Sequence, residues 1–431
     1  MGASLPPVAL RAVAPLRHRL TFGVLGGDVG TQGLPGQNTT SYLTIAIPDD
    51  AYAVRIGLAQ MDSNTNPYTI TKAIFCPSTT FDAPDYVNPT GGQAWAPFTW
   101  DYLGADSELP VYTSANTSFT VPAGPGTADP NTGATNIPRV YWSDWAPIVA
   151  SNWGPTPGVK ALFTRVLWPA TSQTFTRATR ALAGWTGVPS VNQGYDLFLC
   201  NLNTDSVTSP NNAVGTGNAF SIVYNPIYAL QVMSRTAGVQ IMAMGDSHIG
   251  GDKSDANMDP FWVKSALSLS SPKLPVMPWN TAHGGQPSAT FFPLFMGNLA
   301  AGCPSIVVLQ GWSANDSPPS LWYNGIARVL SAAQKALTLG ALPIITTPLP
   351  RGSIAQANLA IWTDIRTRLL NSGTSAEIFD VLPIVGNQSS PGVYDGTYLP
   401  GLSTDGVHPN SAGHAALAAR FKPFLRRVIG L

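Results

Sequence analysis

The pattern of hydrophobic and polar positions along the chain changes near residue 235. Before that point, short apolar or alternating runs are each bounded by clusters of Gly, Pro, Asn or Ser, and the clearest are SYLTIAI, YAVRIGLAQM, ALFTRVLW, YDLFLC and FSIVY. Such runs favour strands, and many short strands separated by turns are typical of a β-sandwich or jelly roll. The Pro- and Gly-rich stretch 120–138 would break a strand ladder and is predicted to be a loop. The pattern fits one sandwich with long loops or two smaller ones.

After residue 238 the chain alternates between apolar runs and helical patterns. The candidate strands are near-continuous apolar runs, as expected for a parallel sheet covered on both faces, and they lie at 239–244, 274–279, 305–310, 341–346 and 376–381. The clearest helical patterns lie at 319–339, 353–371 and 409–430. This alternation predicts a doubly wound α/β sheet of about five parallel strands. We therefore expect a β-rich accessory domain over residues 1–235 and an α/β domain over residues 236–431.

The composition limits the classes of partner. Of the 431 residues only 11% are charged and the formal net charge is +0, which leaves no basic surface for nucleic acid and no acidic tail. Hydrophobic residues make up 44% and there are 12 Trp, which excludes a disordered chain. No run approaches the roughly 18 apolar residues that a membrane span needs. These features predict a soluble globular protein that binds neither nucleic acid nor a membrane, and they leave its oligomeric state open.

Neither the cysteines nor the first 20 residues identify the cellular compartment of the protein. Cys76, Cys200 and Cys303 are an odd number, lie far apart and include no C-x-x-C pair, so they predict neither a disulfide framework nor a cysteine zinc site. Residues 1–20 contain no uninterrupted apolar stretch and do not resemble a signal peptide. The richness in Gly, Pro, Thr and Asn is typical of exported proteins, so composition alone favours secretion.

Polar residues of catalytic type follow the candidate strands. In an open α/β sheet, ligands bind outside the carboxyl ends of the strands, so residues at these ends are expected to meet. The stretches concerned are Gly-Asp-Ser-His at 245–248, Asn-Thr-Ala-His-Gly-Gly at 280–285, Asn-Asp at 315–316 and, before the last helix, Asp-Gly-Val-His at 405–408.

These stretches hold the four groups that hydrolysis of an acyl bond needs. Ser247 is the candidate nucleophile and His408 the candidate general base. Asp405 precedes the histidine by three residues and is the candidate that holds its second nitrogen. The backbone N–H groups of Ser247 and Gly285 and the side-chain amide of Asn315 are the candidate oxyanion hole.

The same stretches resemble the four sequence blocks of the SGNH, or GDSL-type, hydrolase family. The resemblance covers residues 238–431 and implies a five-stranded flavodoxin-like sheet, with Ser247, Gly285, Asn315 and His408 as the name-giving residues and Asp405 completing a catalytic triad.

Three positions depart from the family's pattern. His248 follows the serine where Leu is common, and Ser313 stands where the third block more often has Gly. The second block is loose, so Gly284 competes with Gly285 as the oxyanion donor.

The remaining polar residues near the strand ends have weaker interpretations. Asp246 is expected to brace the serine turn, and His248 and Trp312 are candidates for lining the substrate site. His248, His283 and Asp246 together suggest a metal site, but their spacing matches no usual ligand motif, so neither a metal nor another cofactor is expected. His414 lies in a helical pattern and is expected to be a packed or surface histidine.

The sequence therefore predicts a serine esterase that hydrolyses short acyl esters through a covalent acyl-enzyme. The resemblance further implies acetyl groups on carbohydrates, since family members paired with a β-sandwich often remove them. The α/β-hydrolase alternative fails because Ile249 occupies the last position of its G-x-S-x-G signature. A carbohydrate-binding or surface protein with an inactive hydrolase-like domain is the remaining alternative. Four tryptophans are candidates for stacking on sugars, although core packing is the commoner role: Trp95, Trp100, Trp142 and Trp145.

Overall fold

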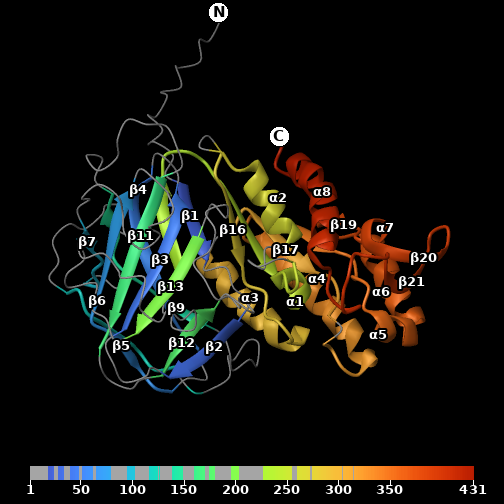
Figure 1. Ribbon diagram of the computed structural model, residues 1–431, viewed down its shortest axis with the longest axis horizontal. Coiled ribbons are helices and arrows are strands. Elements are labelled where there is room, and N and C mark those ends of the chain that lie inside the picture. The colour runs from blue at the N-terminus through green and yellow to red at the C-terminus, as the bar shows by residue number, and fades with distance from the viewer. Residues whose placement is uncertain are drawn as a thin grey trace, which may run out of the picture.

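The fold is known for most of the chain after residue 227 and for a set of strands before it (Figure 1). The computed structural model describes residues 18–23, 28–33, 39–47, 51–61, 65–78, 95–101, 116–124, 126, 138–148, 160–169, 174–179, 196–202, 227–254, 260–271, 274–302, 304–313 and 315–431. For several of the N-terminal strands only the backbone is described.

A five-stranded parallel sheet forms the centre of the C-terminal half. Its strand order is β16-β15-β17-β18-β19, with strands at Val276–Asn280, Val239–Met244, Ile306–Gln310, Leu342–Thr346 and Glu377–Phe379. In chain order this is 2-1-3-4-5, the flavodoxin-like order. Strands β15, β16 and β17 are buried along almost their whole length, which explains their near-continuous apolar sequences. The five parallel strands predicted from the sequence are thus confirmed.

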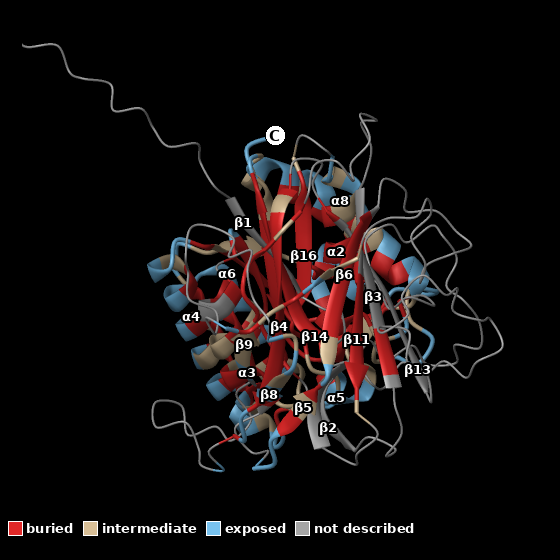
Figure 2. Ribbon diagram, turned by 90° about the vertical axis from the view of Figure 1, so that its left-hand side faces the viewer, coloured by how far each residue is buried: buried red, intermediate tan, exposed pale blue. Residues whose placement is uncertain are grey.

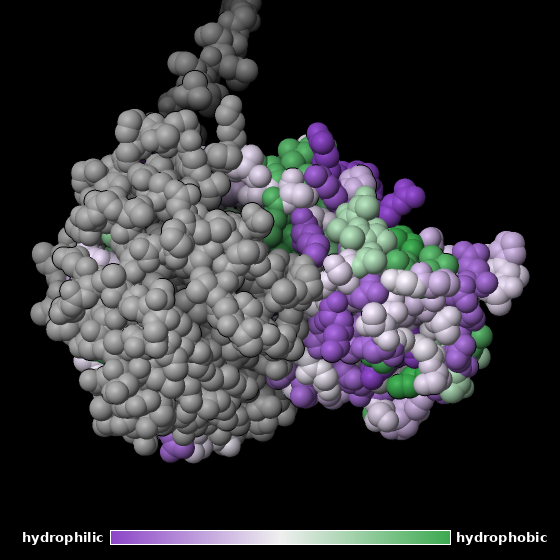
Figure 3. Space-filling view, in the orientation of Figure 1, coloured by the Kyte–Doolittle hydropathy of each residue, from purple (hydrophilic) through white to green (hydrophobic). Residues whose placement is uncertain are grey.

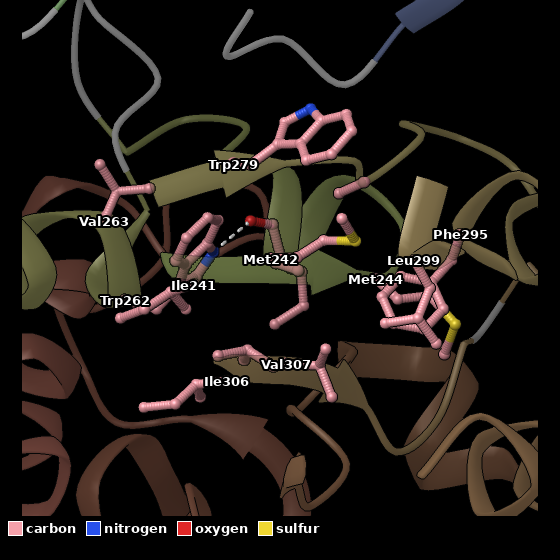
Figure 4. Packing of buried hydrophobic residues seen from close by; sticks show 14 of the residues in the cluster. Ile241, Met242, Met244, Trp262, Val263, Trp279, Phe295, Leu299, Ile306 and Val307 are labelled. Atoms are coloured by element: carbon pink, nitrogen blue, oxygen red, sulfur yellow. Dashed lines mark hydrogen bonds between the residues drawn. The ribbon is translucent and has the colours of Figure 1, made fainter. Parts of the chain in front are cut away.

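Helices cover both faces of this sheet. The helices of this half include α2 (Phe261–Leu269), α3 (Ser288–Gly302), α4 (Trp322–Thr338), α5 (Gly352–Ala357), α6 (Leu359–Leu370), α7 (Leu382–Val385) and α8 (Ser411–Val428), of which α5 packs on strand β21 (Val393–Tyr398) outside the sheet. On one face α2 packs on α8, where the rings of Phe261 and Phe421 meet edge to face. In Figure 4, Trp262 of α2 lies beside Ile241 of β15, and Trp279 of β16 lies beside Met242 of β15.

The predicted helices differ from the observed ones at their ends. The pattern at 319–339 begins as a 3-10 turn, Pro319–Leu321, before α4. The pattern at 353–371 is two helices, which meet at Asn358. The sequence did not reveal α3, because its residues SATFFPLFMGNLAAG are apolar nearly all round and lack the one-sided period of a surface helix.

Antiparallel sheets form the described part of the N-terminal half. One contains β1 (His18–Gly23), β14 (Ile227–Ser234), β4 (Ala51–Met61), β10 (Ala146–Pro147) and β9 (Pro138–Trp142). The other has the order β13 (Asp196–Leu202), β3 (Thr39–Ile47), β11 (Lys160–Trp168), β6 (Lys72–Ser78) and β7 (Ala96–Pro97). Two short pairs join β12 (Thr174–Thr179) to β2 (Asp28–Gly33) and β5 (Tyr68–Ile70) to β8 (Phe119–Val121).

Four of the predicted N-terminal strands are present, as β3, β4, β11 and β13. The run FSIVY at 220–224 and most of the predicted loop at 120–138 lie outside the described residues. Buried side chains from the two larger sheets, such as Ile56 of β4 and Val166 of β11, belong to one hydrophobic core. Figure 2 shows this concentration of buried strands.

The two halves meet beside β16 through a hydrogen bond and an aromatic ring contact. β14 ends at Ser234 and β15 begins at Val239, so only a short link joins them. Tyr228 of β14 donates a hydrogen bond of 2.7 Å to Asn298 Oδ1 of α3, and its ring meets the edge of Trp279. On the face shown in Figure 3, hydrophilic and hydrophobic residues of the C-terminal half are intermixed. Within the described residues, no helix has both the length and the apolar character to cross a bilayer.

Candidate active site

Ser247 lies at a tight turn where β15 passes into the short helix α1 (Ser247–Gly250). Asp246 caps this helix, since its side chain accepts the backbone N–H of His248 at 3.0 Å. Gly245 is required at the turn because a Cβ there would collide with the side-chain oxygen of Gln310. The expected bracing role of Asp246 is therefore present in the structure, and it fixes the direction of the serine.

The structure brings Ser247, His408 and Asp405 into one chain of contacts. His408 Nε2 lies 2.9 Å from Ser247 Oγ, and His408 Nδ1 lies 2.9 Å from Asp405 Oδ2. Both are ordinary hydrogen-bond distances. A carboxylate only accepts, so it fixes the proton on Nδ1 and leaves the Nε2 lone pair facing the serine hydroxyl.

Asp405 also holds the loop that carries His408. Its Oδ1 atom accepts the backbone N–H groups of Val407 and His408, each at 2.8 Å. Burial alone would raise the pKa of Asp405, but the hydrogen bonds from His408 and Val407 outweigh it and hold the pKa well below its usual range. The carboxylate therefore remains ionised and can stabilise a protonated His408.

Asp246 is fully buried and is the centre of a second network of hydrogen bonds. Its Oδ1 accepts His248 Nδ1 at 2.9 Å, and its Oδ2 accepts Ser313 Oγ at 2.6 Å and Asn315 Nδ2 at 3.2 Å. Burial raises the pKa of Asp246, yet the charge and hydrogen bonds of His248 and the hydrogen bond from Ser313 lower it to about 2. This ionised carboxylate thus joins the serine turn to the candidate oxyanion residue Asn315.

Asn315 is held from both ends of its amide. Nδ2 donates to Asp246 and, at 3.3 Å, to the carbonyl of Gln286, while Oδ1 accepts Arg351 NH1 at 3.1 Å. Arg351 was not found from the sequence because it belongs to no motif. The available signal was its position beyond the carboxyl end of β18, where a parallel sheet presents residues to a ligand.

The loop that contains Gly285 lies between the serine turn and Asn315. His283 N–H donates to Gly245 O at 2.8 Å, and the carbonyl of Gln286 accepts the Asn315 amide. Gly285 has a φ of +70°, a conformation that favours glycine, and no atom lies within 4 Å of where a Cβ would be. The backbone of Gly285 is therefore open to an incoming ligand.

His248 and Trp312, the two residues that the sequence suggested for lining the substrate site, have buried side chains. The side chain of His248 is fully buried and its ring nitrogens contact Asp246 and the carbonyl of Val407. Trp312 is only 2% exposed and packs edge to face on Trp322. Both residues follow a strand end, but their side chains turn into the core.

His414 has a packing role, and the residues considered as metal ligands do not form a cluster. His414 is fully buried in α8, and its Nδ1 accepts the backbone N–H of Phe261 at 3.2 Å. In the part of the chain that the structure describes, no group of three His, Cys, Asp or Glu residues could hold a metal ion.

Two of the four tryptophans considered for sugar stacking are buried. Trp100 and Trp145 are each 2% exposed and belong to the protein core. Trp95 and Trp142 are half-buried, and each lies beneath an arginine, Arg165 at 4.3 Å and Arg55 at 4.9 Å from the ring centre. A sugar would compete with these guanidinium groups for the ring faces.

Comparison with known proteins finds similarity at the level of structure. No family model and no curated protein matches the chain. Similar solved structures include a protein assigned to the G-D-S-L lipolytic family from Desulfitobacterium hafniense, at 16% identity and TM-score 0.35, over 43% of this chain and 98% of that one. A psychrotrophic esterase from Pseudoalteromonas is similar at 12% identity and TM-score 0.35, over 44% of this chain and 99% of that one.

A family two carbohydrate esterase from Cellvibrio japonicus is similar over a longer stretch, covering 96% of this chain and 99% of its own, at 11% identity and TM-score 0.32. The structural neighbours thus include members of the family that the four motifs resemble. With identities of 11 to 16% and TM-scores of 0.32 to 0.35, these likenesses do not assign a function, which is inferred below from the geometry of the site.

Proposed function

We propose that this protein is a serine esterase that hydrolyses short acyl esters, acetyl esters above all, through a covalent acyl-enzyme. The observation that carries the proposal is the continuous contact from Asp405 through His408 to Ser247. A hydroxyl, an imidazole and an ionised carboxylate in this order are the arrangement that activates a serine nucleophile.

In the proposed reaction, Ser247 Oγ attacks the ester carbonyl carbon while its proton passes to His408 Nε2. Asp405 stabilises the imidazolium that forms. The negative charge on the former carbonyl oxygen is stabilised by the backbone N–H groups of Ser247 and Gly285 and by Asn315 Nδ2, which exchanges its 3.3 Å hydrogen bond to the Gln286 carbonyl for one to the oxyanion. The C–O bond to the alcohol then breaks, and the alcohol leaves with the proton from His408. A water molecule repeats the sequence to release the carboxylic acid and restore the serine.

The burial of the nucleophile supports a small acyl group. Ser247 is only 6% exposed, and the neighbouring residues His248 and Ile249 are fully buried. An acyl chain of many carbons would need an apolar channel beside the serine, whereas an acetyl group needs little space. The proposal of carbohydrate esters as natural substrates rests on the sequence resemblance.

We assign the chemistry to residues 236–431 and an accessory role to residues 1–235, as a β-sandwich or jelly-roll domain that binds a glycan or covers the mouth of the site. The separate sheets support this division, because no described strand pairing joins a strand before Ser234 to one after Val239. The contact of Tyr228 with Asn298 and Trp279 supports a fixed relation between the two domains.

The test is hydrolysis of p-nitrophenyl esters of rising acyl length, beside acetylated sugars and xylan, by the wild type and the Ser247→Ala variant. We expect turnover to fall as the acyl chain lengthens, and to disappear in Ser247→Ala. Ser254→Ala is the matched control, since Ser254 is a buried serine just beyond the same turn and should leave activity unchanged. Undiminished turnover in Ser247→Ala would disprove the mechanism, and a wild type that binds glycans without cleaving any ester would favour the binding-protein alternative.

A further inference from the structure

The two ring nitrogens of His248 face two groups that only accept hydrogen bonds. Nδ1 lies 2.9 Å from Asp246 Oδ1, and Nε2 lies 2.7 Å from the backbone carbonyl oxygen of Val407. A neutral imidazole carries one N–H and one lone pair. It would therefore place a lone pair against an oxygen at one of these short contacts, inside a site where the side chain has no exposure to water.

A neutral ring would satisfy both contacts only if Asp246 carried a proton on Oδ1. That oxygen already accepts the backbone N–H of His248 at 3.0 Å, and Oδ2 accepts Ser313 and Asn315. These three hydrogen bonds, counted apart from the imidazole, stabilise the carboxyl group as the anion. The proton therefore belongs on the imidazole.

The carbonyl of Val407 receives a second donor. Tyr398 of β21 (Val393–Tyr398) donates its hydroxyl to the same oxygen at 3.1 Å. Burial raises the pKa of Tyr398, so its phenol keeps the proton that it donates. Both lone pairs of the Val407 oxygen are thus used, and the residue directly before His408 is fixed by two donors.

We propose that His248 is a buried, doubly protonated imidazolium and that it is a positioning residue, which fastens the loop of His408 to the turn of Ser247. The positioning role rests on the proposed esterase function. The positive charge of His248 is argued independently of that function. Two independent parts of the site meet at this ring: Asp246 directly before the nucleophile, and Val407 directly before the base.

The cation also lies close to the other ionisable groups of the site. Its ring centre is 5.3 Å from that of His408, and the nearest ionisable groups are Asp246 before α1, Tyr398 of β21, and Asp405 in the loop that carries His408. Beyond them lie Arg351, whose charge acts on Tyr398, and Asp316, whose charge interacts with that of Asp246. A buried ion pair gains little stability over an apolar pair of the same size. A role in holding catalytic groups in place explains why a charge lies directly behind the nucleophile.

The charge is tested by NMR of the full chain with nitrogen-15 in histidine. At about pH 8, where a free imidazole is neutral, we expect both ring nitrogens of His248 to show protonated shifts and attached protons. His414 is the internal reference, since it is equally buried but its Nδ1 accepts a hydrogen bond and so must lack a proton. The His248 signals are identified by their loss in His248→Gln. An unprotonated nitrogen at His248 would overturn the proposal.

The positioning role is tested by the kinetics of His248→Gln and His248→Leu on a p-nitrophenyl acetyl ester. Displacement of His408 by a fraction of an ångström should lower kcat by about 100-fold in His248→Leu, with KM nearly unchanged. The loss should be smaller in His248→Gln, whose amide N–H can still donate to Val407. His414→Gln is the matched control and should keep the wild-type kcat.

The pH profile separates the charge from mere packing. Without the imidazolium, the uncompensated Asp246 carboxylate attracts a proton to His408, so the acidic limb of kcat/KM should move to higher pH in His248→Gln. A kcat unchanged in both variants would refute the positioning role, and so would an acidic limb of kcat/KM that does not move. If both variants fail to fold, the NMR measurement on the wild type still tests whether His248 is doubly protonated. If Ser247→Ala proves active, the esterase proposal fails while the charge of His248 stands on its own measurement.

Discussion

His408 Nε2 lies 2.9 Å from Ser247 Oγ, although 161 residues separate the two in the sequence. The contact arises because the serine follows β15, an inner strand of the sheet, at its carboxyl end, and the loop before α8 returns to the same edge of the sheet. Parallel strands place all such loops on one side, so the sheet itself gathers the reacting groups.

Replacing either partner of the serine should remove most of the rate. We expect His408→Ala to lower kcat by about 10²- to 10⁴-fold, because among the described residues the Ser247 hydroxyl is hydrogen-bonded to His408 and to no other side chain. Asp405→Asn should also lower kcat, since an amide can present an N–H to Nδ1 and so turn the Nε2 proton towards the serine. Steady-state kinetics on a p-nitrophenyl acetyl ester measure both effects.

The control for these variants is Asp364→Asn, which removes an exposed carboxylate paired with Arg368 on α6. It should leave kcat unchanged. Wild-type turnover in His408→Ala would mean that a base other than His408 serves Ser247.

Arg351 should act through Asn315 rather than on its own. Its guanidinium holds the amide oxygen of Asn315 at 3.1 Å, which keeps Nδ2 directed away from Arg351. Asn315→Ala is expected to lower kcat by about 10²- to 10³-fold, the usual loss for an oxyanion donor. Arg351→Met should lower kcat by about tenfold with the native asparagine and much less in the Asn315→Ala background.

A double-mutant cycle measures this coupling. Arg368→Met is the control, because Arg368 is exposed and its carboxylate partner lies outside the site. Additive losses in the cycle would show that Arg351 contacts the substrate directly or serves only the fold.

The strands and the positions of the candidate site residues were accessible from the sequence for one physical reason. A buried parallel strand needs apolar residues on both faces, so each strand is visible as a continuous run, and the polar residue that follows marks its end. Ser247, Asn315 and His408 all lie just beyond such apolar runs or in the loop before an amphipathic helix.

The direction of side chains within the turns was not accessible in the same way. His248 is adjacent to Ser247, yet one side chain faces the base and the other enters the core, because the short helix α1 rotates successive residues by about 100°. Spacing alone does not report this rotation. The contact of Arg351 with Asn315 likewise depends on how two separate loops pack.

The ionised Asp246 should make stability depend on pH in a defined window. Its pKa falls from 3.8 to about 2 on folding, so the folded state binds its proton less tightly than the unfolded state does. The stabilisation is fully present above about pH 4 and is lost as the pH falls towards 2, and it amounts to about 2 kcal/mol. Urea unfolding of the wild type and Asp246→Asn should show a difference that narrows over this range. A constant difference from about pH 6 to 2 would mean that the carboxylate is not preferentially ionised in the folded protein.

The choice between Gly284 and Gly285 as oxyanion donor can be made by alanine substitution at each. Gly285 has a φ of +70° and Gly284 is not among the described glycines with positive φ, while open space surrounds Gly285 where a Cβ would be. Gly285→Ala should therefore cost about 1 kcal/mol through the backbone alone, without any clash. Relief of that strain would rotate the peptide and turn its N–H away from the developing charge, so kcat should fall about tenfold or more while KM changes little. Gly284→Ala should have near wild-type kcat and stability. A larger loss of kcat in Gly284→Ala than in Gly285→Ala would assign the donor to Gly284, and equal wild-type rates in both would remove this loop from the oxyanion hole.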